Sequence, residues 1–254
     1  MSRRTLLCAM VLLSVVGCVG SPPSASPAAS NSGVPSTETT ASPPTPSASP
    51  CVDELRNEAP LVAGCTYQSV GFVPHVRFVA DSSWTALLDI RDQVALAYGN
   101  QQDGLGMSLI DVENLFATAC DAKAITNSSA VYVTTPWKES AAGKGPQEFF
   151  AWLARQRPLV MSEPHAVVIA GQPGLETTVS APADSLAACG HWLMITDTKS
   201  PGGALGIPEK ASIRIDALDA GGQTILVWVF APDAAKIGVI SGASDSLLST
   251  LTFP

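Results

Sequence analysis

The chain has 254 residues, of which 46% are hydrophobic, and its formal net charge is −8. Two basic side chains, Arg3 and Arg4, and one acidic side chain, Glu38, precede residue 51, so the rest of the chain has a net charge of about −9. It contains no cluster of basic residues, which argues against nucleic acid and against anionic lipid head groups as partners. Its length of about 200 residues suits one domain.

The first 18 residues have the pattern of a bacterial lipoprotein signal. Arg3 and Arg4 precede an apolar stretch over residues 6–16, which is shorter than the roughly 20 residues that a membrane-spanning helix needs. The segment Val15-Val16-Gly17-Cys18 resembles a lipobox, in which the cysteine thiol takes a diacylglycerol group. We therefore predict a signal peptide over residues 1–17, acylation of Cys18 with palmitate among its acyl chains, and a lipid-anchored extracytoplasmic location. An ordinary signal peptide is the alternative, and export by the twin-arginine or the general route stays open.

Residues 18–50 form the next predicted segment. From residue 21 it is rich in serine, proline and threonine and has a single charge, Glu38. Such a segment has no apolar face to offset the entropy of ordering, so we expect a disordered tether. In the extended polyproline conformation it spans on the order of 100 Å. The globular domain is then expected over residues 51–254.

Four cysteines lie in the predicted domain: Cys51, Cys65, Cys120 and Cys189. An even number in an exported domain indicates two disulfide bonds, which four cysteines can form in three ways. We favour Cys51–Cys65 with Cys120–Cys189, because the first pair closes a short loop at the start of the domain. No CxxC motif occurs, which argues against a zinc or thioredoxin-like site.

Strand patterns dominate the domain, at residues 67–72, 76–80, 130–134, 165–170 and 174–180. The clearest hairpin joins residues 212–218, which alternate and predict one solvent-facing side, to the apolar run 224–231 through a turn at 219–222. A helix is expected from Pro146 to Arg155, with Phe149, Trp152 and Leu153 covering the sheet. Further helix is expected over 233–240 and 245–251, before a short final strand. This order predicts an α+β fold with a mostly antiparallel sheet flanked by a few helices.

Several of these segments resemble a family. The helix ending in Trp152-Leu153, the strand 165–170, the turn Gly171-Gln172-Pro173-Gly174 and the closing residues 246–253 resemble actinobacterial cell-envelope lipoproteins with PsbP-like or LpqN-like domains. The resemblance covers residues 66–254. It implies a sheet flanked by helices and a non-enzymatic role in the envelope. It supplies no catalytic residue.

Candidate chemical sites are weak throughout the domain. His75, His165 and His191 would form a metal site only if the fold brought them to one point, and scattered histidines are more often hydrogen-bonding residues. Ser241-Gly242 does not fit the G-x-S-x-G motif and predicts a helix end. The carboxylates of Asp53-Glu54 and of Asp216 and Asp219 are expected at solvated edges and turns. We predict no enzymatic activity, no cofactor and no metal.

Two further segments bear on binding. Residues 99–107 are rich in glycine but lack the lysine of a phosphate-binding loop, so a hairpin loop is expected. Trp137 lies in a turn-like segment and is therefore the tryptophan that we consider as a candidate for an exposed, ligand-binding side chain. Together the observations predict a non-catalytic binding or scaffolding role in the cell envelope. The alternatives are capture of a lipid or glycan in a groove between sheet and helix, and a hydrolase with an unrecognised site.

Overall fold

The computed structural model describes residues 51–112, 114–115, 125–127, 130–132, 145–189, 192–197 and 204–254. These residues belong to a compact unit, Pro50–Pro254. The predicted signal peptide and tether lie outside the described residues, as do Cys18, Cys120, Trp137 and His191. None of the described helices has both the length and the apolar character required to cross a membrane.

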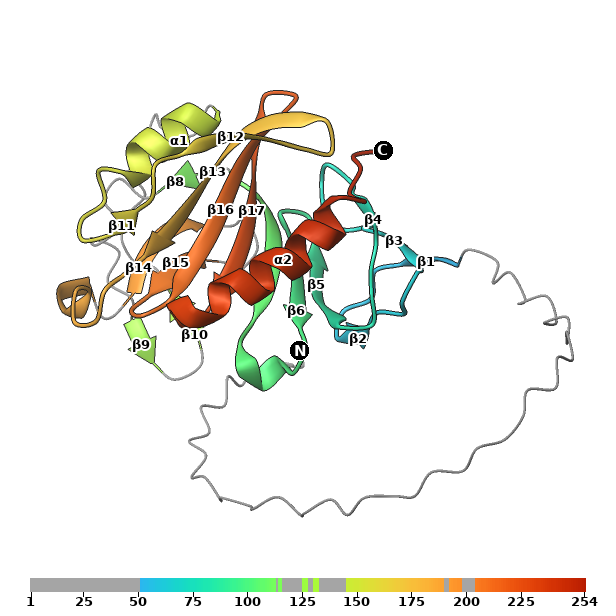
Figure 1. Ribbon diagram of the computed structural model, residues 1–254, viewed down its shortest axis with the longest axis horizontal. Coiled ribbons are helices and arrows are strands. Elements are labelled where there is room, and N and C mark those ends of the chain that lie inside the picture. Colours follow the sequence, from blue (N-terminus) through green and yellow to red (C-terminus); the bar gives the residue numbers. More distant parts are fainter. Residues whose placement is uncertain are drawn as a thin grey trace, which may run out of the picture. The chain divides into compact units, whose positions relative to one another are not determined.

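The main sheet of the described residues has nine strands, and all of its pairs are antiparallel. The order is β11-β13-β16-β17-β7-β6-β5-β2, and β12 also pairs with β13 (Figure 1). The strands are β2 (Ala59–Pro60), β5 (Trp84–Ile90), β6 (Gln93–Tyr98), β7 (Gly106–Asp111), β11 (Val160–Met161), β12 (His165–Ile169), β13 (Gln172–Ser180), β16 (Ser212–Ala220) and β17 (Gln223–Ala231).

Smaller sheets and short helices complete the described part. One sheet joins β1 (Val52–Glu54), β3 (Thr66–Gln68) and β4 (Arg77–Val79), another joins β8 (Asn114–Leu115), β14 (Trp192–Asp197) and β15 (Ala204–Pro208), and a hairpin joins β9 (Ile125–Asn127) to β10 (Ala130–Tyr132). The helices are α1 (Pro146–Leu153) and α2 (Ile237–Leu248), with 3₁₀ turns η1 (Gln101–Asp103), η2 (Ala187–Cys189) and η3 (Ala234–Lys236). The predicted α+β class with a mostly antiparallel sheet is therefore confirmed.

Both faces of the central strands are buried. Along β17, Val227 and Val229 belong to a core with Ile240 and Leu247 of α2, whereas Leu226 and Trp228 belong to a second core with α1. Since neighbouring side chains on a strand point to opposite faces, α2 covers one face and α1 the other. Residues of β14 and β15 also pack in the second core. Figure 1 shows α2 crossing β16 and β17.

The prediction that one side of residues 212–218 faces solvent is wrong. All seven residues are buried, because α2 packs on the face where water was expected. That face carries Arg214 and Asp216, which the alternation suggested were exposed. The hairpin itself is confirmed, with β16 and β17 running in register up to the Gly221-Gly222 turn. Both glycines have positive φ, which a two-residue hairpin turn favours.

The predicted helix from Pro146 is confirmed as α1. Its Phe149, Trp152 and Leu153 are buried against the sheet, as expected. The hairpin that follows it turns one residue earlier than predicted, at Ala170-Gly171, where φ is 53° and 76°. Two residues with positive φ match the twist of the flanking strands, so β13 begins at Gln172 and includes Pro173.

The predicted helix end at Ser241-Gly242 is also wrong. Both residues lie inside α2, which continues to Leu248 because Ser244, Leu247 and Leu248 extend its buried face. A single glycine inside a helix costs only about 1 kcal/mol, which packing of that face offsets. The expected final strand is reduced to one bridge between Arg77 and Thr252. Residues 99–105 do form the loop of the β6–β7 hairpin, whereas Gly106 and Met107 already belong to β7.

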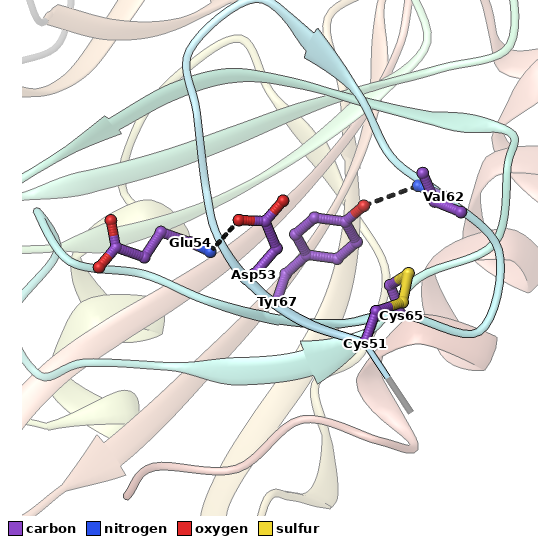
Figure 2. The surroundings of a disulfide bond; sticks show 6 residues. All are labelled: Cys51, Asp53, Glu54, Val62, Cys65 and Tyr67. Carbon is purple, nitrogen blue, oxygen red and sulfur yellow. Dashed lines mark hydrogen bonds between the residues drawn. A yellow bond between two sulfur atoms is a disulfide. The ribbon is translucent and has the colours of Figure 1, made fainter. Parts of the chain in front are cut away.

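A disulfide bond joins Cys51 to Cys65, as predicted (Figure 2). Beside it, the Tyr67 hydroxyl accepts a hydrogen bond from the backbone N–H of Val62 at 2.7 Å, and Tyr67 is buried. These contacts fix the loop at the start of the domain. Cys189 is buried and disulfide-bonded, but Cys120 lies outside the described residues, so the pairing of these two stays a prediction.

Candidate functional site

A row of charged side chains crosses three adjacent strands of the main sheet. His165 of β12 is in register with Glu176 of β13, which is in register with Asp216 of β16. His165 Nε2 lies 3.5 Å from Glu176 Oε1. Directly opposed residues lie on the same face of a sheet, and like charges in such a pair are destabilising. Glu176 and Asp216 therefore need a cation between them.

Arg214 supplies this cation. It lies two residues before Asp216 and therefore on the same face of β16. Its Nε and Nη2 donate to the two oxygens of Asp216 at 3.1 and 3.0 Å, and its Nε lies 3.2 Å from Glu176 Oε2. Such two-pronged guanidinium–carboxylate contacts are the strong form of an ion pair.

Helix α2 adds a third carboxylate. Arg214 Nη1 donates to Asp245 Oδ1 at 2.5 Å, which ties the helix to the sheet. The burial of the four side chains is graded: Asp216 is fully buried, Arg214 is 8% exposed, Glu176 is 21% exposed and Asp245 is 60% exposed. The charged cluster thus leads from the core to the surface, with Asp245 at its outer end.

Protonation of the cluster is set by its environment. Burial raises the pKa of Asp216 to about 7; Glu176 adds to this effect, and the bonds from Arg214 oppose it. Burial alone would lower the pKa of Arg214, but Asp216, Asp245 and Glu176 together raise it. Arg214 therefore stays charged, while Asp216 exchanges a proton with solvent near neutral pH.

A cavity of about 420 Å³ opens at the outer end of the cluster. It lies between the turn of the β12–β13 hairpin, the last turn of α2 and the residues after it, with Arg214 and Asp245 as its charged lining residues. The remaining lining residues are Val168, Ile169, Ala170, Gly171, Leu248, Ser249 and Leu251. The cavity therefore combines several apolar side chains with polar groups, among them one exposed carboxylate and one buried guanidinium.

The histidines and carboxylates that the sequence suggested as candidate site residues differ in their exposure. His75 and His165 are both exposed, and no group of His, Cys, Asp or Glu within the described ranges is arranged to hold a metal ion. Asp53 and Asp219 are exposed, as expected for an edge and a turn. The expectation for Asp216 is wrong, because α2 and Arg214 enclose it.

The Arg214 cluster was missed by the sequence reasoning. The available signal was an arginine in the middle of an otherwise apolar alternating strand, with an aspartate two residues later on the same face. An arginine placed between Ile213 and Ile215 requires a partner, which indicates a buried ion pair. The contributions of Glu176 and Asp245 depend on strand register and helix packing, which no local pattern encodes.

The sequence matches no protein-family model and no curated protein. Among solved structures, the chain is similar to the solution structure of cyanobacterial PsbP (CyanoP) from Synechocystis sp. PCC 6803. The match covers 74% of this chain and 92% of that chain, at 9% sequence identity and a TM-score of 0.34. That protein is of the PsbP kind, which the sequence suggested as a resemblance; the fold of this chain is defined by its own strand pairing. Membership of an actinobacterial lipoprotein family stays a prediction.

Proposed function

We propose that the chain is an extracytoplasmic lipoprotein, anchored through Cys18, whose domain captures a small ligand without catalysing a reaction. The observation that carries the capture role is the cavity of about 420 Å³ beside Arg214 and Asp245. Small-molecule sites typically have volumes of about 300 to 1,000 Å³, an apolar lining and a few polar groups that fix orientation. Capture of a small ligand was the alternative to a scaffolding role in the sequence-based interpretation, and a pocket beside charged groups supports it over docking of a protein.

The lining supports binding rather than catalysis. The hydroxyl of Ser249 donates to the backbone carbonyl of Ser246 at 2.7 Å, and no histidine stands beside it among the described residues of the lining. Arg214 is already held by Asp216, Glu176 and Asp245. A nucleophile needs an adjacent base, whereas fixed charges and an apolar wall are sufficient to hold a ligand.

The anchor is tested by replacing Cys18. In an exporting bacterial host fed an alkyne-labelled fatty acid, the full-length protein takes up the label and sediments with the membrane. We expect Cys18→Ala to abolish labelling and to release the protein from the membrane fraction. Cys8→Ala, which changes a cysteine inside the predicted signal peptide, is the matched control and leaves both unchanged. Labelling that persists in Cys18→Ala would contradict the proposal.

The capture role is tested by solvent extraction of the purified full-length protein, followed by mass spectrometry of the extract. We expect the wild-type extract to contain a small molecule in roughly stoichiometric amount. The extract of Ser249→Trp should lack it, because the tryptophan side chain fills the cavity. Ser246→Trp is the control, because Ser246 is exposed on the same helix and does not line the cavity. Equal amounts of the compound in both variants, or none in any extract, would contradict capture in this cavity.

A further inference from the structure

The charges around the cavity do not balance. Arg214 faces three carboxylates, those of Asp216, Glu176 and Asp245, and His165 is the other titratable group beside Glu176. Even when Asp216 is protonated, the other two carboxylates exceed the single positive charge of Arg214 by one negative charge. Because Arg214 and Asp216 are buried and already bonded to each other, that charge is presented to the cavity by Asp245, the exposed member of the cluster.

The position of Asp245 on α2 strengthens the effect. Asp245 lies in the C-terminal part of the helix, and the last turn of α2 has no basic residue. The C-terminal end of a helix carries a partial negative charge, so cations are favoured there and carboxylates are not. The residues Leu248 and Ser249, at this same end, line the cavity. Helix dipole and side chain thus favour the same sign of ligand charge.

The remainder of the lining is mainly apolar. Ile169, Leu248 and Leu251 are buried and line the cavity, whereas Val168, next to Ile169 on β12, directs its side chain to the opposite face of the strand. Burial of apolar ligand surface contributes about 25 cal/mol per Å². A ligand without an apolar body would leave this wall unused, and an anion would meet the unbalanced carboxylate.

From these observations we infer that the captured ligand is a small organic cation, with an amine nitrogen at Asp245 and an apolar body against Ile169, Leu248 and Leu251. The inference rests on the proposed capture function and adds the chemical class of the ligand. In this arrangement the ammonium group occupies the side of Asp245 that Arg214 does not contact. Arg214 is then a positioning residue, because it holds the Asp245 carboxylate at the cavity.

Three probes of equal shape and different charge test the inference: cyclohexylmethylamine, cyclohexylmethanol and cyclohexanecarboxylate. Each is titrated at pH 8 into the full-length protein in detergent and followed by saturation-transfer NMR, with protein-free micelles as the blank. We expect the amine to bind at least about 10-fold more tightly than the alcohol, and the carboxylate to show no saturable binding. Added salt should reduce the preference for the amine, since exposed charges are screened.

Asp245→Asn identifies the carboxylate responsible. We expect this variant to bind the amine and the alcohol within about threefold of each other. Glu148→Gln removes an exposed carboxylate on α1, on the other face of the sheet, and is expected to retain the wild-type preference. Far-ultraviolet circular dichroism of both variants checks that they are folded.

The possible contrary results are distinct. Equal binding of all probes, tightest binding of the carboxylate, or an unchanged preference in Asp245→Asn would overturn the cation inference. Displacement of the amine by millimolar Mg²⁺ alone would also overturn it, in favour of an inorganic cation. If no probe binds while the solvent extract contains a compound, the inference fails and capture stands. If the extract is also empty, both fail.

Discussion

Replacing Arg214 by methionine tests the buried cluster. Methionine keeps much of the side-chain volume but removes the charge that separates Asp216 from Glu176. Breaking a buried ion pair by removing one partner typically costs about 3 to 5 kcal/mol, because the other charge stays buried without compensation. Since Asp216 is fully buried and Glu176 is directly opposite it, we expect Arg214→Met to lower the free energy of unfolding by this amount at pH 7.5.

The assay is urea denaturation followed by tryptophan fluorescence, with the same slope assumed for each variant. At pH 5, where Asp216 is protonated, the cost of Arg214→Met should fall to less than half. The double variant Arg214→Met/Asp216→Leu should recover most of the loss, because it leaves no unpaired charge on β16. Arg155→Met, at an exposed arginine, should change stability by less than about 0.5 kcal/mol. A cost below about 1 kcal/mol for Arg214→Met at pH 7.5 would refute the reasoning.

Four further predictions concern stability. The pKa of Asp216 is raised from 3.8 to about 7, so the folded state binds this proton more tightly than the unfolded chain, and the free energy of unfolding falls as pH rises through that range. In urea unfolding, the wild type should lose about 3 kcal/mol more than Asp216→Asn between pH 4.5 and 7.5. Parallel pH profiles of the two proteins would contradict this. A Cβ at Gly174 would lie 2.4 Å from the Ala217 carbonyl oxygen, so Gly174→Ala should lower the melting temperature by several degrees. At Gly242 on α2 a Cβ would meet open space, so Gly242→Ala should raise the free energy of unfolding by about 0.5 to 1 kcal/mol. Ser244 Oγ is buried with no hydrogen-bond partner among the described residues, so Ser244→Ala should stabilise by about 1 kcal/mol in the same assay. Cys65→Ser opens a loop closed over a sequence separation of 14 and should cost about 3 kcal/mol in urea, whereas a reducing agent, which also opens the disulfide of Cys189, should lower the stability of the wild type further.

How far the sequence predicts the fold depends on whether the information is local. Proline at the start of α1 and the apolar spacing of Phe149, Trp152 and Leu153 are local, and that helix was found correctly. The β16–β17 hairpin was found for the same reason, since Gly221-Gly222 lies between two matching strand patterns. In contrast, the alternation of β16 indicated a solvent-facing side. The helix that covers this side comes later in the chain, and only the tertiary structure places it there.

The candidate site illustrates the same limit more strongly. Arg214 and Asp216 are two residues apart, so their pairing is available from the sequence. Glu176 joins them through strand register, and Asp245 joins them through helix packing. The cavity then depends on a hairpin turn at Ala170-Gly171 that the sequence placed one residue too late. A site assembled from four separate segments is therefore not visible in any one of them.

Native mass spectrometry of the full-length protein, purified from an exporting host, tests ligand capture most directly. Spectra are recorded before and after mild denaturation. We predict that the native spectrum shows a mass excess of one small molecule, which disappears on unfolding. The mass of the denatured protein should be that of a chain that starts at acylated Cys18. An identical mass in both spectra, with no bound small molecule at any protein concentration, would contradict the proposal that this domain captures a ligand.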